Sequence, residues 1–284
     1  MNSLTKKIDF VLFVSVRQAN PNGDPLLGNM PRTDYEGYGE ISDVCIKRKI
    51  RNRLQDMGQE IFVQANDQID DTYASLEDRF KAYFTTKQSD EEVAAAACQR
   101  WIDVRSFGQV MTFQKRALGI RGPVSVSLGK SLSPVDVITM QITRSTNGMA
   151  SESGKRSADT MGTKHFVDFG VYKITGSMNC YFAQRTGFSD EDAQLIRQAL
   201  LSLFENDMSS ARPEGSMTVE KLYWFVHPNA LGIASSAKVH QLVQAQALAD
   251  DKVHDFSDYV VSVDEERLNL YRQKGLTLEI EDGI

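Results

Sequence analysis

The sequence predicts an α+β fold in which helices pack on an antiparallel sheet, and three observations support this prediction. The first is an alternation of apolar residues over 8–16, with the second face partly apolar as well, as expected of a strand near the centre of a sheet. The second is a pair of segments, 43–57 and 190–206, whose apolar residues recur at helical spacing. The third is the element order: strand, helix, two strand regions, helix, strand. This order is that of a ferredoxin-like or RNA-recognition-motif fold.

Start and stop signals place the individual elements. The first helix begins at Ser42, a good capping residue, and its apolar stripe is formed by Ile46, Ile50, Leu54 and Met57. Ser89 and Glu92 form a capping-box pattern that opens an alanine-rich helix over 93–101. Further helices are expected from Ser189 to Asn206 and from Lys238 to Ala249. Strands are expected over 124–128, 135–143, 166–182, 217–227, 259–263 and 276–280.

We expect a single domain over residues 1–284 with two insertions, because no clean interdomain linker or internal repeat is visible. Residues 59–102 are expected to be a helical insertion. The second insertion, at about 140–166, contains the segment 144–164, which is rich in Ser, Thr and Gly. A polar loop of this length is either a surface excursion or an extended arm that orders on a partner.

Composition is that of an ordinary globular protein, with 41% hydrophobic and 25% charged residues in 284. The formal net charge is −6, yet residues 100–130 hold six Lys/Arg and one acid, whereas 250–284 hold ten acids and four Lys/Arg. Local basic tracks on an acidic body are compatible with holding a polyanion in one groove and repelling it elsewhere. Acidic surface that serves only solubility is the simpler alternative.

Targeting and redox features are few. The three cysteines, Cys45, Cys98 and Cys180, have no paired spacing, which fits a reducing compartment and argues against a disulfide scaffold. No apolar run approaches membrane-spanning length, and the N-terminus has no apolar signal core. We therefore expect a cytoplasmic protein with no membrane partner.

The first helix and the loop before it are the main candidate binding site. Lys47, Arg48 and Arg51 lie off the apolar stripe, and no acid occurs between Ile46 and Gln55, so these charges are expected to lack local partners. A solvated helix face is the ordinary explanation for such a pattern. The strand 8–16, however, runs through a polar loop directly into this helix, so loop amides, the helix start and the cations can converge on phosphates.

A second basic tract follows the helical insertion. Arg105, Phe107 and Gly108 lie close together, and Arg121 follows shortly after. Glycine permits close backbone approach, and an exposed Phe107 can stack on a base. Phe107 as a core aromatic is the alternative.

Five motifs in order resemble the backbone subunit of type I CRISPR surveillance complexes (Cascade), of the RAMP superfamily, with subtype I-C as the most similar subgroup. They are Asn20-Pro21-Asn22-Gly23-Asp24-Pro25 followed by Ser42–Arg51, then Asp103–Gly108, Arg121–Val124 and Met161–His165. The resemblance implies a palm with helical fingers and a thumb arm. It also implies a repeated, non-catalytic subunit that binds CRISPR guide RNA, stacks head to tail on its own copies and on other Cascade subunits, and leaves guide bases free to pair with target DNA.

The candidate RNA-binding residues combine these motifs with the basic tracts. They are Gln18, Asn20, Asn22, Arg32, Ser42, Lys47, Arg48, Arg51, Arg105, Phe107, Gly108, Arg121, Arg144, Met149, Lys164 and His165. No cofactor or metal is expected, since the four histidines lack metal-ligand spacing and no Walker loop or nucleophile elbow occurs.

Two other functions remain open from the sequence. One is a metal-dependent ribonuclease that uses Asp24 or Asp34 in the loop before the first helix, although a turn-forming role for Asp24 is the more ordinary one. The other is a monomeric module that binds single-stranded RNA.

Overall fold

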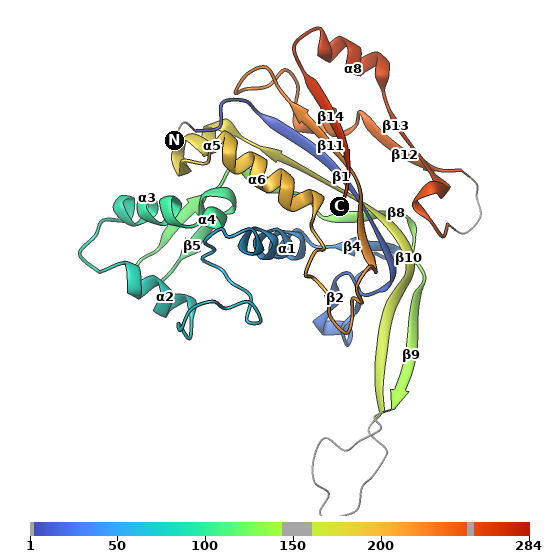
Figure 1. Cartoon of the computed structure of the whole chain (residues 1–284), viewed down its shortest axis with the longest axis horizontal. Helices are drawn as coiled ribbons and strands as arrows, with labels where there is room; N and C mark the ends of the chain where they lie inside the picture. The colour runs from blue at the N-terminus through green and yellow to red at the C-terminus, as the bar shows by residue number, and fades with distance from the viewer. Residues whose placement is uncertain (1–2, 144–160, 249–252) are drawn as a thin grey trace, which may run out of the picture.

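The computed structural model describes residues 3–143, 161–248 and 253–284. Within them, eight strands form one antiparallel sheet whose main path is β14–β11–β1–β10–β8–β4, with β7 and β9 also paired to β10 (Figure 1). The bounds are β1 Ile8–Ala19, β4 Tyr38–Ile41, β7 Val124–Val126, β8 Gly129–Pro134, β9 Val137–Thr143, β10 Met161–Met178, β11 Met217–Val226 and β14 Thr277–Asp282. The expected mixed α+β fold with a large antiparallel sheet is confirmed.

Strand β1 lies in the middle of this sheet, between β10 and β11, as its two apolar faces predict. Phe10 stacks on Trp224 of β11 with ring centroids 5.9 Å apart, and both side chains are fully buried. The strand runs further than the sequence suggested, to Ala19, and Gln18 within it adopts a positive φ of 51°. Gln18 is exposed while its neighbour Ala19 is buried, so the strand ends with a local distortion.

Helices α1 (Asp43–Asp56) and α6 (Asp190–Leu201) contribute to the hydrophobic cluster on one side of β1. Both predicted caps are present: Ser42 Oγ accepts from the Cys45 amide at 3.2 Å, and Ser189 forms a capping box with Asp192. Helix α6 ends at Leu201, before the expected Asn206. A short helix that the sequence analysis missed, α5 (Cys180–Thr186), follows β10 directly.

The other side of β1 is covered by the C-terminal segment. It comprises α7 (Ser236–His240), β12 (Val243–Ala247), the 3-10 turn Phe256–Asp258, β13 (Tyr259–Val263) and α8 (Glu265–Arg272). The predicted helix 238–249 is wrong, because only 236–240 is helical and 243–247 pairs with β13. Val243 packs into the second core cluster from a strand, so tertiary pairing overrides local helix propensity here.

Residues 62–120 build a third hydrophobic cluster beside the sheet, at the left of Figure 1. Its elements are α2 (Leu76–Tyr83), α3 (Asp90–Arg100), α4 (Ile102–Phe107), β5 (Gly108–Met111) and β6 (Leu118–Arg121). The capping box of Ser89 and Glu92 opens α3 as predicted. Helix α4 and strand β8 were not predicted, because neither has a periodic pattern long enough to detect.

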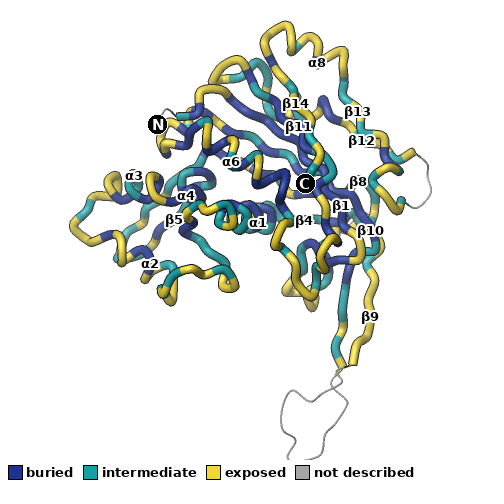
Figure 2. Tube along the Cα trace, viewed as in Figure 1, coloured by how far each residue is buried: buried dark blue, intermediate teal, exposed yellow. Residues whose placement is uncertain are grey.

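Strand β9 and the first residues of β10 form a hairpin that projects from the sheet (Figure 1). Its β9 strand is largely exposed, in contrast to the buried middle of β1 (Figure 2). On one face of the hairpin, Met140 pairs with Lys164 and Ile138 with Phe166. Arg144 and Met149 of the predicted arm lie outside the described residues.

The loop between β1 and α1 is structured. It contains β2 (Gly23–Asp24), a 3-10 turn (Pro25–Leu27) and β3 (Met30–Pro31).

No helix within the described parts of the chain is long and apolar enough to cross a membrane.

Candidate nucleic-acid interface

The loop after β1 and the start of α1 are joined by a direct hydrogen bond. Asn22 Oδ1 accepts from the Ser42 amide at 2.8 Å, and the Ser42 side chain in turn caps α1. Asn20 is buried and donates from Nδ2 to the Asn29 carbonyl at 2.6 Å. Three of the candidate residues, Asn20, Asn22 and Ser42, therefore shape the backbone of this junction.

The cations of α1 do not form the unpaired outer face that was expected. Lys47 pairs with Asp43 at 3.0 Å, one turn earlier. Arg51 donates from Nε to Asp103 at 3.1 Å, with side chains 13% and 1% exposed. Arg48 donates to the Val63 carbonyl at 2.6 Å. The prediction that these charges are not paired locally is wrong for Lys47, because Asp43 lies one turn earlier, and the acceptors Val63 and Asp103 of Arg48 and Arg51 come from more distant parts of the chain.

Asp103 fixes the position of Arg51, because its own carboxylate is fixed by further hydrogen bonds. Its carboxylate also accepts from the amides of Phe62 and Val63, at 2.8 and 3.1 Å. The guanidinium of Arg51 lies 5.0 Å from the ring centroid of Phe107, which itself packs against the first core cluster. Phe107 is therefore an internal aromatic of the junction between α1 and α4, and not an exposed stacking side chain.

Of the remaining residues of the second basic tract, Arg105 and Gly108 are internal, whereas Arg121 is exposed. Arg105 forms a two-pronged pair with Asp192 at the start of α6, at 2.8 and 2.9 Å. Gly108 has φ 78° and closes α4, and a Cβ there would lie 2.2 Å from the Ile120 carbonyl oxygen. Only glycine fits at this crossing of β5 and β6. Arg121 is exposed and lies over the Phe182 ring of α5 at 5.4 Å.

A groove of about 480 Å³ lies where the β9–β10 hairpin leaves the sheet, and we call it the hairpin-base groove. Three segments line it. The end of β1 contributes Arg17 and Gln18, the hairpin contributes Met140, Lys164 and Phe166, and the loop before β11 contributes Pro213–Ser216. Lys164 forms no ion pair with any described residue. His165 points to the other face of the hairpin strand, where Nδ1 lies 2.8 Å from Thr139 Oγ1.

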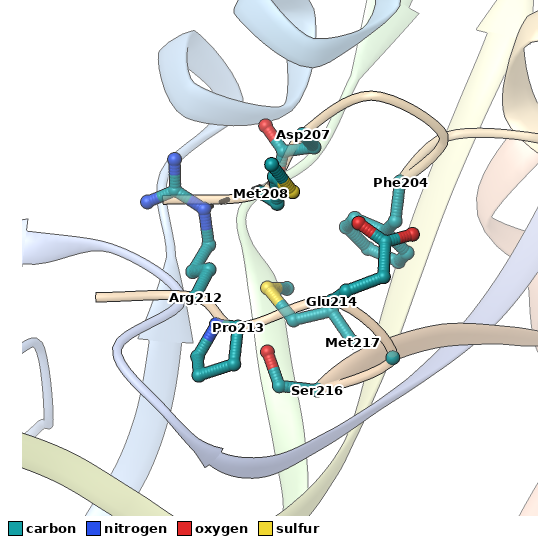
Figure 3. Close-up of a pocket in the computed structure, with 9 residues that line it drawn as sticks. Phe204, Asp207, Met208, Arg212, Pro213, Glu214, Ser216 and Met217 are labelled. Carbon is teal, nitrogen blue, oxygen red and sulfur yellow. Dashed lines mark hydrogen bonds and ion pairs between the residues drawn. The ribbon is translucent and has the colours of Figure 1, made fainter. Parts of the chain in front are cut away.

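The loop 204–217 connects this groove to α1. Arg212 contacts Asp207 at 3.1 Å, and Asp207 also pairs with the buried Lys49 of α1. Figure 3 shows these loop side chains around a small pocket. Burial lowers the pKa of Lys49, while the adjacent Asp207 carboxylate opposes this change. The loop is thus anchored at one end by an internal ion pair and borders the hairpin-base groove at the other.

The two loop aspartates that the nuclease alternative would use are both engaged by cations. Asp24 pairs with Arg32 at 3.4 Å and accepts from the Leu26 amide at 3.0 Å, which closes the 3-10 turn. Asp34 pairs with Lys130 at 2.7 Å, a contact that lowers the pKa of Asp34. Over residues 3–143, 161–248 and 253–284, no group of three or more His, Cys, Asp or Glu side chains is arranged to hold a metal ion.

The structure therefore divides the predicted residues into separate groups. Gln18 and Lys164 meet in the hairpin-base groove, Asn22 and Ser42 are bonded to each other, and Arg51 contacts Phe107. Arg105 lies apart from these groups at the start of α6, and Arg121 lies over α5. The other groove residues were not predicted from the sequence: Arg17, Met140, Phe166 and the loop 213–216. A turn-forming Arg212-Pro213-Glu214-Gly215 stretch before a strand was the available signal for that loop.

Comparisons with known proteins agree with this architecture. A family model described as CRISPR-associated protein Cas7 matches residues 6–264. A CRISPR-associated protein Cas7 from Haloferax volcanii is 26% identical over 221 residues, which are 70% of this chain and 65% of that protein. The match thus spans less than two thirds of the relative's length.

Solved structures of "CRISPR RNA-guided surveillance complex" contain similarly folded chains. One superposes with a TM-score of 0.54 at 14% identity, over 97% of this chain and 88% of that chain. Another, described as pre-nicking, has a TM-score of 0.49 at 13% identity, over 77% and 75%. The superposition with a TM-score of 0.54 shows that the two chains share a fold. Since the family model covers nearly the whole sequence, from residue 6 to residue 264 of 284, this chain belongs to the CRISPR-associated protein Cas7 family.

Proposed function

We propose that this protein is a guide-RNA-binding backbone subunit of a CRISPR RNA-guided surveillance complex. The observation that carries the proposal is the hairpin-base groove, in which Gln18 and Lys164 lie beside Met140 and Phe166. Lys164, which pairs with no acid among the described residues, supplies a phosphate contact, an amide supplies a hydrogen bond, and apolar side chains supply a surface for a sugar or base.

The groove is built to hold its shape without a ligand. Arg17, at its edge, is fixed by Asp255 at 3.2 Å and by the His254 carbonyl at 2.8 Å, and lies over Phe169 at 5.0 Å. The Arg17 amide donates to the Ser216 carbonyl at 2.8 Å, which joins the loop to the strand. Preformed walls reduce the entropic cost of binding.

In this proposal the sheet with α1 and α6 is an RNA-recognition-motif-like palm of a single domain, 1–284. Residues 59–102 are the fingers and residues 140–166 the thumb. The strand order around β1 and the two helices on one side support the palm assignment. The assignment to subtype I-C rests on the motifs alone and stays a prediction.

The same proposal extends to partners. The protein holds guide phosphates in a non-catalytic role, stacks head to tail with its own copies and with other subunits in the cytoplasm, and leaves base edges free for target DNA. The chain that superposes with a TM-score of 0.54 comes from a CRISPR RNA-guided surveillance complex, which supports the guide as the ligand.

Binding of a labelled single-stranded guide RNA tests the proposal. The double variant Gln18→Ala and Lys164→Ala should bind the guide at least tenfold more weakly, and the loss should be similar for guides of different sequence. Lys274→Ala, an exposed lysine in the C-terminal segment, is the matched control and should bind normally. Equal affinities for all three proteins would refute the groove as the guide site.

Incubating the same RNA with Mg²⁺ or Mn²⁺ separates this function from the ribonuclease alternative. We expect no metal-dependent cleavage by the purified protein. Cleavage that disappears in Asp24→Ala or Asp34→Ala would replace the proposed function with an enzymatic one.

A further inference from the structure

A second surface outside the hairpin-base groove combines arginines with aromatic rings. Helix α5 presents Tyr181, Phe182 and Arg185, and Arg121 approaches from the end of β6. Arg121 lies 5.4 Å from the Phe182 ring centroid, and Arg185 lies 4.5 Å from that of Tyr181. The two rings meet edge to face at 5.4 Å. We call these four side chains the α5 surface.

The α5 surface is open to solvent. Arg121 and Arg185 are exposed, and Tyr181 is 57% exposed. Neither arginine forms an ion pair with a described carboxylate; Arg185 donates instead to the Tyr181 hydroxyl. This distinguishes them from Arg51 and Arg105, whose charges are neutralised by Asp103 and Asp192. The structure leaves both positive charges of the α5 surface available to an anionic ligand.

A groove of about 430 Å³ adjoins this surface, between α3 and α5. It is lined by Arg185, Thr186 and Gly187 of α5 and the following turn, and by Ala95, Cys98, Gln99 and Arg105. Arg185 belongs both to the groove and to the aromatic cluster, so the two features are continuous. A ligand chain that crosses Tyr181 can therefore enter the groove.

The α5 surface is far from the hairpin-base groove. Strand β10 separates them, since Lys164 and Phe166 lie near its beginning and α5 follows its last residue, Met178. Twelve strand residues span roughly 40 Å. Figure 1 shows α5 and the β9–β10 hairpin at opposite ends of the molecule. One short ligand bound at the hairpin base does not reach α5, so the two surfaces bind separately.

We propose that the α5 surface is a second binding site for single-stranded nucleic acid. Aromatic rings stack on bases without sequence preference, and arginine side chains add phosphate contacts and stack on bases themselves. A single-stranded nucleic acid uses both kinds of group on this surface, since its phosphates meet the arginines and its bases meet the rings. This inference stands on the α5 contacts and does not depend on the proposed guide site.

Photo-crosslinking of short oligonucleotides tests the proposal. A 12-nucleotide oligouridine carrying 5-iodouridine, and its DNA counterpart with 5-iododeoxyuridine, are irradiated with the purified protein and the crosslinked peptides are mapped by mass spectrometry. We expect crosslinks to Tyr181 or Phe182. The double variant Arg121→Ala and Arg185→Ala should lose them and bind the oligonucleotide about tenfold more weakly at this site. The RNA and DNA arms show which strand the surface prefers.

Two control variants distinguish binding at the α5 surface from binding at the hairpin-base groove. Lys274→Ala should retain the α5 crosslink, and Gln18→Ala with Lys164→Ala should retain it as well, whatever happens at the hairpin base. If crosslinks map only to the hairpin-base groove, or if the double arginine variant crosslinks at α5 like the wild type, the α5 proposal is overturned and the proposed function stands. Crosslinks at α5 alone would support the α5 proposal and would contradict the hairpin-base groove as the site of the proposed function. Circular dichroism establishes that each variant is folded.

Discussion

Two cations on α1, Lys47 and Arg51, occupy different environments although they lie one turn apart. Lys47 pairs with Asp43 across one helical turn on the surface. Arg51 pairs with Asp103, whose carboxylate is fully buried and also accepts two backbone amides. Exposed helix pairs contribute a few tenths of a kcal/mol, whereas removing one member of a buried pair leaves an uncompensated charge.

The first prediction follows from this contrast. Arg51→Ala should lower the free energy of unfolding by roughly 3–5 kcal/mol, because Asp103 stays buried without its cation. Lys47→Ala should lower it by less than about 1 kcal/mol. Urea denaturation of the two variants and the wild type measures both values. A similar small change for both variants would show that the pair of Arg51 with Asp103 contributes little to stability.

A group of titratable side chains surrounds the buried Asp9 at the beginning of β1. Asp9 is fully buried, 2.8 Å from His227 Nε2 and 3.1 Å from Lys7. Burial tends to raise the pKa of Asp9, but hydrogen bonds from His227 and Ser236 and the charge of Lys7 outweigh it, so its pKa is lowered. His240 lies 3.7 Å from Asp9, and burial lowers the pKa of His240.

The second prediction concerns the pH dependence that these groups impose. Because the pKa of His240 is lower in the folded protein, the unfolded chain takes up a proton first as the pH falls below about 6.5, and stability decreases. Asp9 adds a further loss at lower pH, because below about 4 its carboxylate takes up a proton in the unfolded chain, whereas its lowered pKa keeps it ionised in the folded protein to lower pH. His240→Gln should flatten the decline in Tm between about pH 6.5 and 5 while leaving the acid-side loss. An unchanged Tm profile in this variant would contradict the assignment to His240.

At the scale of elements, the β9–β10 hairpin presents one face with a single lysine among apolar side chains. Ile138, Met140 and Ile142 alternate along β9, and Lys164 lies opposite Met140. All three apolar side chains are at least 36% exposed. Exposed apolar residues on a projecting hairpin indicate a surface that is covered in an assembly.

The third prediction separates the two kinds of contact on this face. Lys164→Ala should weaken guide-RNA binding and reduce the slope of log affinity against log salt by roughly 0.7, the value for one phosphate contact on a single strand. Met140→Ser with Ile142→Thr should weaken binding with no change of slope, because no charge is removed. Affinity measured between 50 and 300 mM salt, concentrations chosen for the assay, gives both numbers. A change of slope in the second variant would show that the apolar residues act through the position of Lys164.

At the scale of the whole molecule, the protein has an acidic composition, and two of its surfaces combine cations with apolar or aromatic side chains. Its net charge is −6, and Lys164 at the hairpin base and Arg185 on the α5 surface, neither of which pairs with a described carboxylate, lie toward opposite ends of β10. Copies that stack head to tail bring unlike ends together and form an open filament when the rotation does not close.

The fourth prediction is that the assembly grows with the guide. With guides of increasing length, light scattering or native mass spectrometry should show additional copies of the protein per RNA at regular length increments. A protein mixed with no RNA should remain at lower mass under the same conditions. A single copy per guide at every length would support the monomeric RNA-binding module that the sequence left open.

The sequence by itself determined the features that depend on neighbouring residues. Alternating apolar residues predicted β1, and the serines at 42, 89 and 189 predicted three helix starts, since caps bond to amides only two or three residues ahead. The order of the main elements also followed from local patterns, and five spaced motifs indicated the family that the comparisons confirm.

Only the tertiary structure decided which polar residues are internal and which are free. Arg51 and Arg105 looked like ligands for phosphate, but their partners Asp103 and Asp192 lie 52 and 87 residues away in the chain. The segment 243–247 became a strand because β13 pairs with it. Lys164, Gln18 and the loop 213–216 form one groove only because β1 ends close to the first residues of β10 and the loop passes beside them. Long-range packing determines such pairings, and no local pattern in a single sequence encodes them.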